Sequence, residues 1–223
     1  MTANALPGFS PNIHAFPFPN SWEPGTPVVE LPTPLGTIRL GNAAGGVCGG
    51  MVFAAADYWL AGRPAPREKS RELFRYFCRR LVDSFALPFG LMRYFDWQRR
   101  PSATNRLTHG VARLTILEEF PRIRSAIDAG LPALLGMVKA HSWRPQDLAQ
   151  NHQVLAFGYA FDESSIRLDC YDPNWPGRTS TLTIDSRDPD ADVGMEHSEE
   201  GNTVRGVFLV NYSRPDDDSQ LPG

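Results

Sequence analysis

Residues 151–173 have the sequence NHQVLAFGYAFDESSIRLDCYDP, which predicts a β-hairpin. Two runs of mostly apolar residues, 152–159 and 166–171, flank the polar turn residues 162–165. Pro173 ends the second run, because proline has no N–H to donate to a strand ladder. An antiparallel hairpin therefore brings the start of the first strand close to the end of the second.

The register of this hairpin decides which polar residue faces His152. In one register His152 lies opposite Asp172, and with the turn centred on residues 163–164 it lies opposite Trp175. Asp172 and Asn174 would face the same side of a regular strand, but the strand ends between them. Asp172 is thus expected to be the better-held partner of His152.

More strands and several helices are expected around the hairpin. Short apolar runs bounded by turn residues predict strands at 131–138, 179–184 and 204–212. The acidic segment 185–201, between the last two, is expected to be a surface loop. Apolar residues at helical spacing predict helices at 48–61, 66–85, 88–98 and 118–129. Helices that come first and a mostly antiparallel sheet that comes second make the α+β class.

The chain is expected to divide into an arm, a body and a tail. Residues 1–40 contain eight prolines, which favour an extended arm over a helix. Aromatic residues in the arm indicate that it packs on the body, namely Phe16, Phe18 and Trp22. The body, 41–214, includes a helical insert at about 63–113. Residues 215–223 are predicted to be a frayed tail.

Composition excludes several classes of protein. The 223 residues are 42% hydrophobic and carry a net charge of −3, as in a soluble globular protein. No apolar stretch approaches the roughly 18 residues of a membrane span, and residues 1–12 do not resemble a signal peptide. With only three cysteines, no disulfide framework is expected, and a cytoplasmic location is the default.

Nucleic acid and metal binding are not predicted either. Twelve Lys/Arg against four Asp/Glu lie between Arg63 and Arg113, but the whole chain is acidic, unlike most nucleic-acid binders. Cysteines and histidines lack the spacing of metal ligands, and the glycine-rich segment 41–50 lacks the Gly-Lys-Ser/Thr of a phosphate loop. We therefore expect no metal and no cofactor.

Cys48 opens the first predicted helix, directly after the loop 41–47. Free N–H groups and the partial positive charge of a helix N-terminus favour the thiolate over the thiol. Glycines on both sides, among them Gly46 and Gly49, would let another backbone approach the sulfur. A nucleophilic cysteine also needs a base and a group that holds the base, and His152 with Asp172 would supply both.

A cysteine that opens a helix, the strand motif N-H-x-V-L-A-x-G-Y at 151–159 and an Asp that ends the next strand resemble the papain-like cysteine peptidases. The segment 129–135 (AGLPALL) and the sequence Tyr-Asp-Pro at 171–173 are similar to the bacteriocin-leader-processing, double-glycine peptidase-like branch. The resemblance covers roughly residues 42–184. It implies a papain-like fold, with N-terminal helices on a mostly antiparallel C-terminal sheet.

The resemblance also assigns roles to individual residues. Cys48 would be the nucleophile, His152 the base and acid, and Asp172 the group that orients His152. Asn42 stands six residues before Cys48, where the family has its oxyanion-hole glutamine. The Cys48 backbone N–H would be the second donor. In one departure, Gly-Gly-Met follows the cysteine, where the family has bulky or hydroxylated residues.

Four further residues are assigned to substrate binding: Gly46, Gly49, Asn174 and Trp175. Asn174 and Trp175 resemble the family's Asn that is followed shortly by a shielding Trp, which makes Asn174 an alternative to Asp172. The implied activity is hydrolysis of a peptide or other amide bond through an acyl-enzyme, with a peptide or protein as substrate. A silent papain-like module that binds a peptide or protein, and an acyl-transfer enzyme, are the alternatives.

Overall fold

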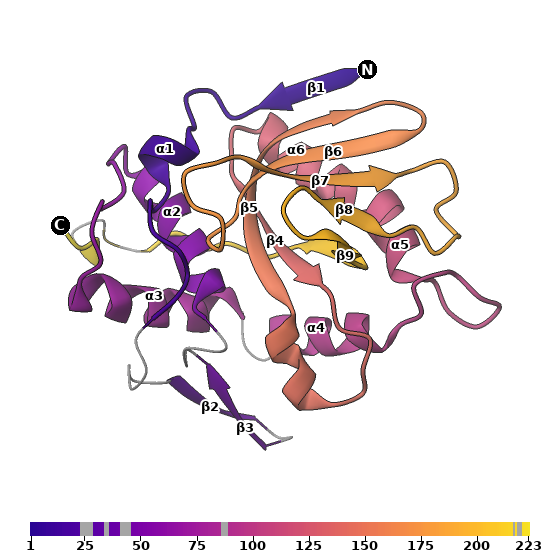
Figure 1. Cartoon of the computed structure of the whole chain (residues 1–223), viewed down its shortest axis with the longest axis horizontal. Helices are drawn as coiled ribbons and strands as arrows, with labels where there is room; N and C mark the ends of the chain where they lie inside the picture. The colour runs from indigo at the N-terminus through magenta and orange to yellow at the C-terminus, as the bar shows by residue number, and fades with distance from the viewer. Residues whose placement is uncertain (23–28, 34–35, 41–45, 86–88, 216, 218–219) are drawn as a thin grey trace.

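The computed structural model describes residues 1–22, 29–33, 36–40, 46–85, 89–215, 217 and 220–223, with backbone only at 29–33 and 36–40 (Figure 1). The helical elements are α1 (Pro11–His14), α2 (Cys48–Leu60), α3 (Arg71–Ser84), α4 (Phe89–Arg99), α5 (Val111–Arg113), the π-helical η1 (Leu114–Glu119), α6 (Phe120–Asp128) and the 3₁₀ segment η2 (Pro145–Gln150). The strands are β1 (Thr2–Ala5), β2 (Val29–Thr33), β3 (Gly36–Leu40), β4 (Ala133–Val138), β5 (His152–Phe161), β6 (Ser165–Tyr171), β7 (Ser180–Asp185), β8 (Met195–His197), β9 (Gly201–Val204) and β10 (Gly206–Leu209).

The described strands form an eight-stranded antiparallel sheet and a separate hairpin of β2 and β3. The order in the large sheet is β10-β4-β5-β6-β7-β8-β9, and β1 pairs with the distal part of β5. In Figure 1, α1, α2 and α3 gather at one side of the sheet, whereas α5 and α6 lie behind it. The α+β class is therefore confirmed, as is a mostly antiparallel sheet in the C-terminal half.

The hairpin of β5 and β6 has a register that changes once along its length. Gly158 pairs with Asp169, and Leu155 pairs with Tyr171, with an irregularity between Ala156 and Gly158. Because β5 has one extra residue at this irregularity, the pairing shifts by one position. The shift goes from the alignment with the turn centred on residues 163–164 toward the alignment that places His152 opposite Asp172. The start of β5 consequently lies beside the 172–175 segment, as predicted.

Most predicted helices and strands are present with shifted ends. The largest difference concerns the helix expected at 118–129, which begins at Val111 and runs through α5, η1 and α6. Thr115 in this early part donates from its hydroxyl to the Val207 carbonyl of β10 and accepts from the Val207 N–H. Contacts with a distant strand thus stabilise helical turns that the local sequence does not predict.

The arm packs on the body, and residues 11–14 of it form the short helix α1 rather than an extended segment. Its first strand, β1, joins the large sheet. The rings of Phe16 and Phe77 lie 4.7 Å apart, and those of Trp22 and Phe74 lie 4.6 Å apart. The arm therefore covers α3 with aromatic side chains.

Two predictions for the C-terminal part need correction. The acidic segment 185–201 was expected to be a surface loop, but it contains β8, whose Met195 and His197 are buried. The tail was expected to be frayed, but Leu221 is buried and the Pro222 carbonyl accepts a hydrogen bond from the Tyr58 hydroxyl, 2.7 Å away. The residues named here are held in place by tertiary contacts, because neither segment has a strong local pattern.

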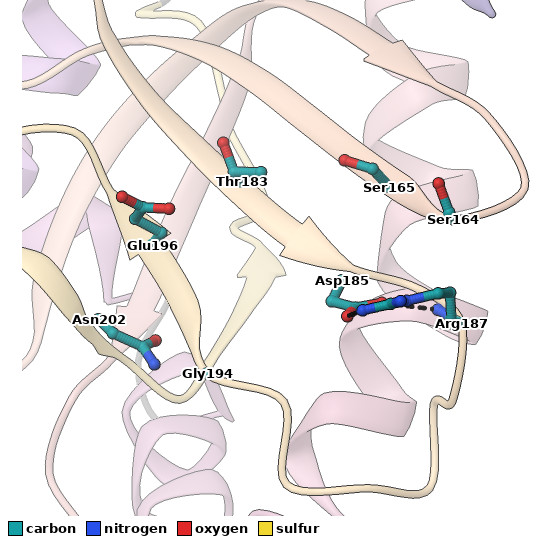
Figure 2. Close-up of a pocket in the computed structure, with 8 residues that line it drawn as sticks. All are labelled: Ser164, Ser165, Thr183, Asp185, Arg187, Gly194, Glu196 and Asn202. Carbon is teal, nitrogen blue, oxygen red and sulfur yellow. Dashed lines mark hydrogen bonds and ion pairs between the residues drawn. The ribbon is translucent and has the colours of Figure 1, made fainter.

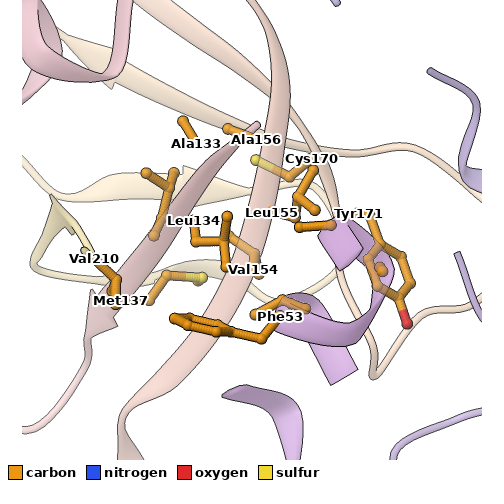
Figure 3. Packing of buried hydrophobic residues seen from close by; sticks show 14 of the residues in the cluster. Phe53, Ala133, Leu134, Met137, Val154, Leu155, Ala156, Cys170, Tyr171 and Val210 are labelled. Atoms are coloured by element: carbon orange, nitrogen blue, oxygen red, sulfur yellow. The ribbon is translucent and has the colours of Figure 1, made fainter. Parts of the chain in front are cut away.

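The core lies where α2 meets the central strands (Figure 3). Phe53 of α2 is fully buried beside Val154 of β5 and Met137 of β4. This packing fixes α2, whose first residue is Cys48, against the strand whose first residue is His152. No helix in the described part of the chain combines the length and the apolar character of a membrane span.

Gly50 allows α2 and α3 to approach each other closely. A Cβ atom at Gly50 would overlap the backbone carbonyl of Phe77 in α3. The helix after Cys48 therefore needs glycine there because of its neighbour within the protein. This explains one residue of the unusual Gly-Gly pair that follows the cysteine.

Gly50→Ala is expected to lower the free energy of unfolding by about 1–3 kcal/mol, because the backbone of α3 must move. Gly62→Ala separates this steric effect from a backbone effect: Gly62 has φ +65° and open space around it. That control should cost only about 1 kcal/mol, from the left-handed conformation. Denaturant titration measures both, and a smaller loss for Gly50→Ala than for Gly62→Ala would contradict the close approach.

Candidate active site

Cys48 is the first residue of α2 and is partly exposed. Its N–H belongs to the first turn, where backbone donors have no acceptor within the helix. The preceding N–H, of Val47, donates to Asn20 Oδ1 at 2.7 Å. The sulfur therefore lies at the positive end of the α2 dipole, on a turn that the arm helps to hold.

His152 and Asp172 form a close buried pair. The Nε2 atom of His152 lies 2.7 Å from Asp172 Oδ1, and the side chains are 6% and 0% exposed. The same Asp172 oxygen accepts a 2.8 Å hydrogen bond from the Asn174 N–H. With Nε2 engaged by the carboxylate, Nδ1 is the ring nitrogen left for the sulfur.

The pKa shifts of the three groups favour an ionised pair. Burial acts to raise the pKa of Cys48, but the charge of His152 and a hydrogen bond from it lower the pKa overall. Burial acts to lower the pKa of His152, but Asp172 and Cys48 raise it to about 10. The pKa of Asp172 is lowered by His152 despite burial. The shifts of Cys48 and His152 thus both act in favour of a thiolate paired with an imidazolium.

A buried polar cluster lies on another side of Cys48. The Gln153 N–H donates to the Cys48 sulfur. The Gln153 side chain donates from Nε2 to Ser84 Oγ at 3.2 Å. Tyr94 is also buried, and burial together with the charge of Cys48 raises the pKa of its hydroxyl. Residues of α3, α4 and β5 therefore contribute to a buried polar cluster beside the start of α2.

The glycines expected to bind substrate have other contacts. Gly49 is buried, and a Cβ atom there would lie 2.6 Å from Ser84 Oγ and 3.0 Å from the Gln153 side chain. Gly46 has φ +59°, and a Cβ atom there would overlap the Asn20 amide. The space that both glycines provide is filled by the protein's own side chains, and their assignment to substrate stays a prediction.

Asn174 and Trp175 follow Asp172 in the loop after β6. The exposed Asn174 side chain accepts a 3.3 Å hydrogen bond from Asn20 Nδ2, and His152 is bonded to Asp172 instead. The Trp175 N–H donates to the Asp172 carbonyl at 3.0 Å. The loop therefore fixes the position of Asp172. Asn42, the expected oxyanion donor, lies outside the described residues.

Asn20 connects the two halves of the site. Besides its bonds to Val47 and Asn174, its N–H donates to the Pro173 carbonyl at 2.9 Å. The arm thereby links the turn before Cys48 with the loop after Asp172. Sequence reasoning missed Asn20, because nothing in its local sequence shows that the arm passes between these segments.

Three other residues near the site were also missed. His197 of β8 places Nε2 3.2 Å from Asp172 Oδ2, with both side chains fully buried. Lys139 and Glu200 form an ion pair, and the Glu200 carboxylate interacts electrostatically with both His152 and Asp172. His197 and Glu200 belong to the segment that we predicted to be an acidic loop, so only its pairing with β7 reveals them.

A polar depression of about 490 Å³ lies on β6–β9, away from α2 (Figures 1 and 2). Its walls carry Thr183, Glu196 and Asn202, and Asp185 is paired with Arg187 at its edge (Figure 2). No residue of the Cys48, His152 and Asp172 group lines it. The residues that line the depression do not include a cysteine or a histidine.

Within the described residues, no cluster of three His, Cys, Asp or Glu side chains is arranged to hold a metal ion. The candidate site is built from Cys48 at the start of α2 and the pair of His152 and Asp172. Comparison with known proteins gave no matching family model, no matching curated protein and no matching solved structure.

Proposed function

We propose that this protein is a papain-like cysteine hydrolase that cleaves a peptide or other amide bond. The observation that carries the proposal is one arrangement: Cys48 at the start of α2, with its pKa lowered by His152, whose Nε2 is held by Asp172 at 2.7 Å. A nucleophile, its base and a group that orients the base are the components of acyl transfer by a thiol.

In the proposed reaction, the Cys48 thiolate attacks the carbonyl carbon of the substrate and forms a C–S bond. The negative charge moves to the carbonyl oxygen, where the Cys48 N–H at the helix N-terminus would stabilise it. His152 then gives its Nδ1 proton to the leaving nitrogen as the C–N bond breaks. Water, deprotonated by His152, then attacks the thioester, and the C–S bond breaks to release the acid and the Cys48 thiolate, with the proton left on His152.

The other two cysteines provide internal controls for a test of this proposal. Burial raises the pKa of Cys78 to about 11 and that of Cys170 well above its usual value. Both thiols should therefore be unreactive at pH 5–6. A reaction in that range reports on Cys48.

The test is the rate of iodoacetamide alkylation across about pH 4–9, with the modified cysteine identified by mass spectrometry. Wild type should react at Cys48 well below pH 8.5, the approximate pKa of a free cysteine. Cys48→Ala should remove this reaction entirely, and His152→Ala should move it to the alkaline range. If Cys48 in wild type titrates like a free thiol, the hydrolase is excluded and a peptide-binding module becomes the better description.

Alkylation tests the nucleophile, and turnover requires substrates. A library of peptide amides incubated with wild type and with Cys48→Ala would detect cleavage that depends on Cys48. Fast alkylation with transfer of the acyl group to an added amine, and no hydrolysis, would indicate the acyl-transfer alternative.

A further inference from the structure

We propose that His197 is a positioning residue of this site, which holds the Asp172 carboxylate in the orientation that it presents to His152. The inference rests on the proposed function and adds a fourth residue to the three that carry it. His197 does not contact the sulfur and acts through Asp172.

The contact joins two buried atoms that have no other partner among the described residues. His197 Nε2 and Asp172 Oδ2 lie 3.2 Å apart, and both side chains are 0% exposed. Within the described residues neither atom makes a well-aligned hydrogen bond, either to the other atom or to a third group. Because a buried polar atom without a partner costs about 1–3 kcal/mol, the two atoms are best explained as serving each other.

The other ring nitrogen of His197 indicates where the proton lies. His197 Nδ1 accepts a hydrogen bond from the Glu199 N–H at 3.3 Å. An accepting Nδ1 in a neutral imidazole leaves the proton on Nε2, which faces Asp172. Asp172 Oδ1 therefore has His152 and the Asn174 N–H as donors, and the Nε2–H of His197 faces Oδ2 from 3.2 Å.

Regular structure holds His197 in place. In β8, His197 pairs with Leu182 of β7, and the next N–H, of Ser198, donates to the Thr181 carbonyl at 3.0 Å. A strand fixed at this point cannot move the ring without breaking the ladder. The imidazole is thus a rigid support for Asp172, as a positioning group must be.

Other charged groups near the pair set the background for any pH measurement. Glu200, paired with Lys139, interacts with both His152 and Asp172. Glu199, whose N–H bonds to His197, carries a side chain paired with Arg178. These charges stay in place when His197 is replaced, so a change in profile reports on the lost imidazole.

Two amide variants test the contact. Glutamine can place its amide N–H near the position of Nε2, whereas asparagine reaches only about as far as Nδ1. His197→Gln should keep the donor to Asp172, and His197→Asn should lose it. His197→Phe removes every donor at similar volume, and His109→Phe, at a histidine near Asp190, is the control for loss of a histidine elsewhere.

The measurement is the pH profile of Cys48 alkylation, together with thermal unfolding of each variant. For His197→Asn and His197→Phe, we expect about tenfold slower alkylation at pH 6, with the acidic limb displaced upward by about one pH unit. His197→Gln should stay within about threefold of wild type, and His109→Phe should match wild type.

Two outcomes would overturn the inference. One is a wild-type profile in all the His197 variants. The other is an equal loss of rate in His197→Gln and His197→Asn that follows their loss of thermal stability, which indicates a role in folding alone. If Cys48 of the wild-type protein shows no reactivity at low pH, the proposed function itself is refuted. The wild-type profile is therefore measured before the variants are made, which separates this failure from a failure of the inference about His197.

Discussion

Asp172→Asn is expected to slow alkylation of Cys48 at pH 6 by about 10–100-fold. The Asp172 carboxylate raises the pKa of His152, and His152 in turn lowers the pKa of Cys48. Asparagine has nearly the same shape but no charge, so the imidazolium loses its main electrostatic partner. Each unit by which the pKa of Cys48 rises gives a tenfold loss of thiolate on the acidic limb of the pH profile.

The contacts of Asp172 make this change larger than a simple loss of charge. An asparagine amide at residue 172 would have to direct its N–H₂ toward either His152 Nε2 or His197 Nε2, both of which face the carboxylate. Two donors would then face each other in a buried site. We therefore expect the orientation of His152 to be disturbed as well as its charge.

The control for this prediction is Asp169→Asn, in β6, three residues before Asp172. Asp169 is paired with Arg167, which is largely exposed, and neither residue belongs to the site. This variant should keep the wild-type alkylation profile. If Asp172→Asn also keeps it, Asp172 does not orient His152, and Asn174 becomes the residue to test.

Arg80→Met is expected to lower the free energy of unfolding by about 3–5 kcal/mol. Arg80 of α3 bonds to Asp57 of α2 through Nε at 2.8 Å and Nη2 at 3.0 Å, and the side chains are 5% and 1% exposed. Burial raises the pKa of Asp57 even with Arg80 beside it, so ionisation of this carboxyl already carries a cost. Without Arg80, the remaining donors to this buried carboxylate among the described residues are the hydroxyls of Tyr76 and Tyr212.

Those hydroxyls suggest a variant that restores stability. Tyr76 and Tyr212 donate to Asp57 at 2.7 and 2.6 Å, and an asparagine oxygen can still accept from them. Asp57→Asn combined with Arg80→Met should therefore recover much of the loss, because no buried charge remains. Calorimetry or denaturant titration of the single and double variants measures this coupling.

The surface pair of Arg124 and Asp128 is the matched control. Its side chains are 45% and 38% exposed, and Arg124→Met should cost no more than about 1 kcal/mol. If Arg80→Met costs as little as Arg124→Met, the buried ion pair does not join α2 to α3. Such a result would also remove a reason for the fixed position of Cys48 at the start of α2.

Local pattern in the sequence was enough to identify the main helices and most strands. The periodicity of 152–159 and 166–171, with turn residues between them, predicted the hairpin and brought His152 to the 172–175 segment. Contacts across a short hairpin depend mainly on nearby residues, and for this reason the sequence predicted them. The bulge in β5, which decides the final register, had no signal of its own.

Tertiary structure decided what surrounds the three candidate residues. Asn20 reaches the site because the arm crosses it, and His197 does so because β8 pairs with β7. Gly49 and Gly50 are required by Ser84, Gln153 and the backbone of α3, all distant in sequence. Such contacts depend on how separate elements pack together, which periodicity along one chain does not encode. The sequence by itself thus determined the α+β class and the proximity of His152 to Asp172, and packing determined what holds them in place.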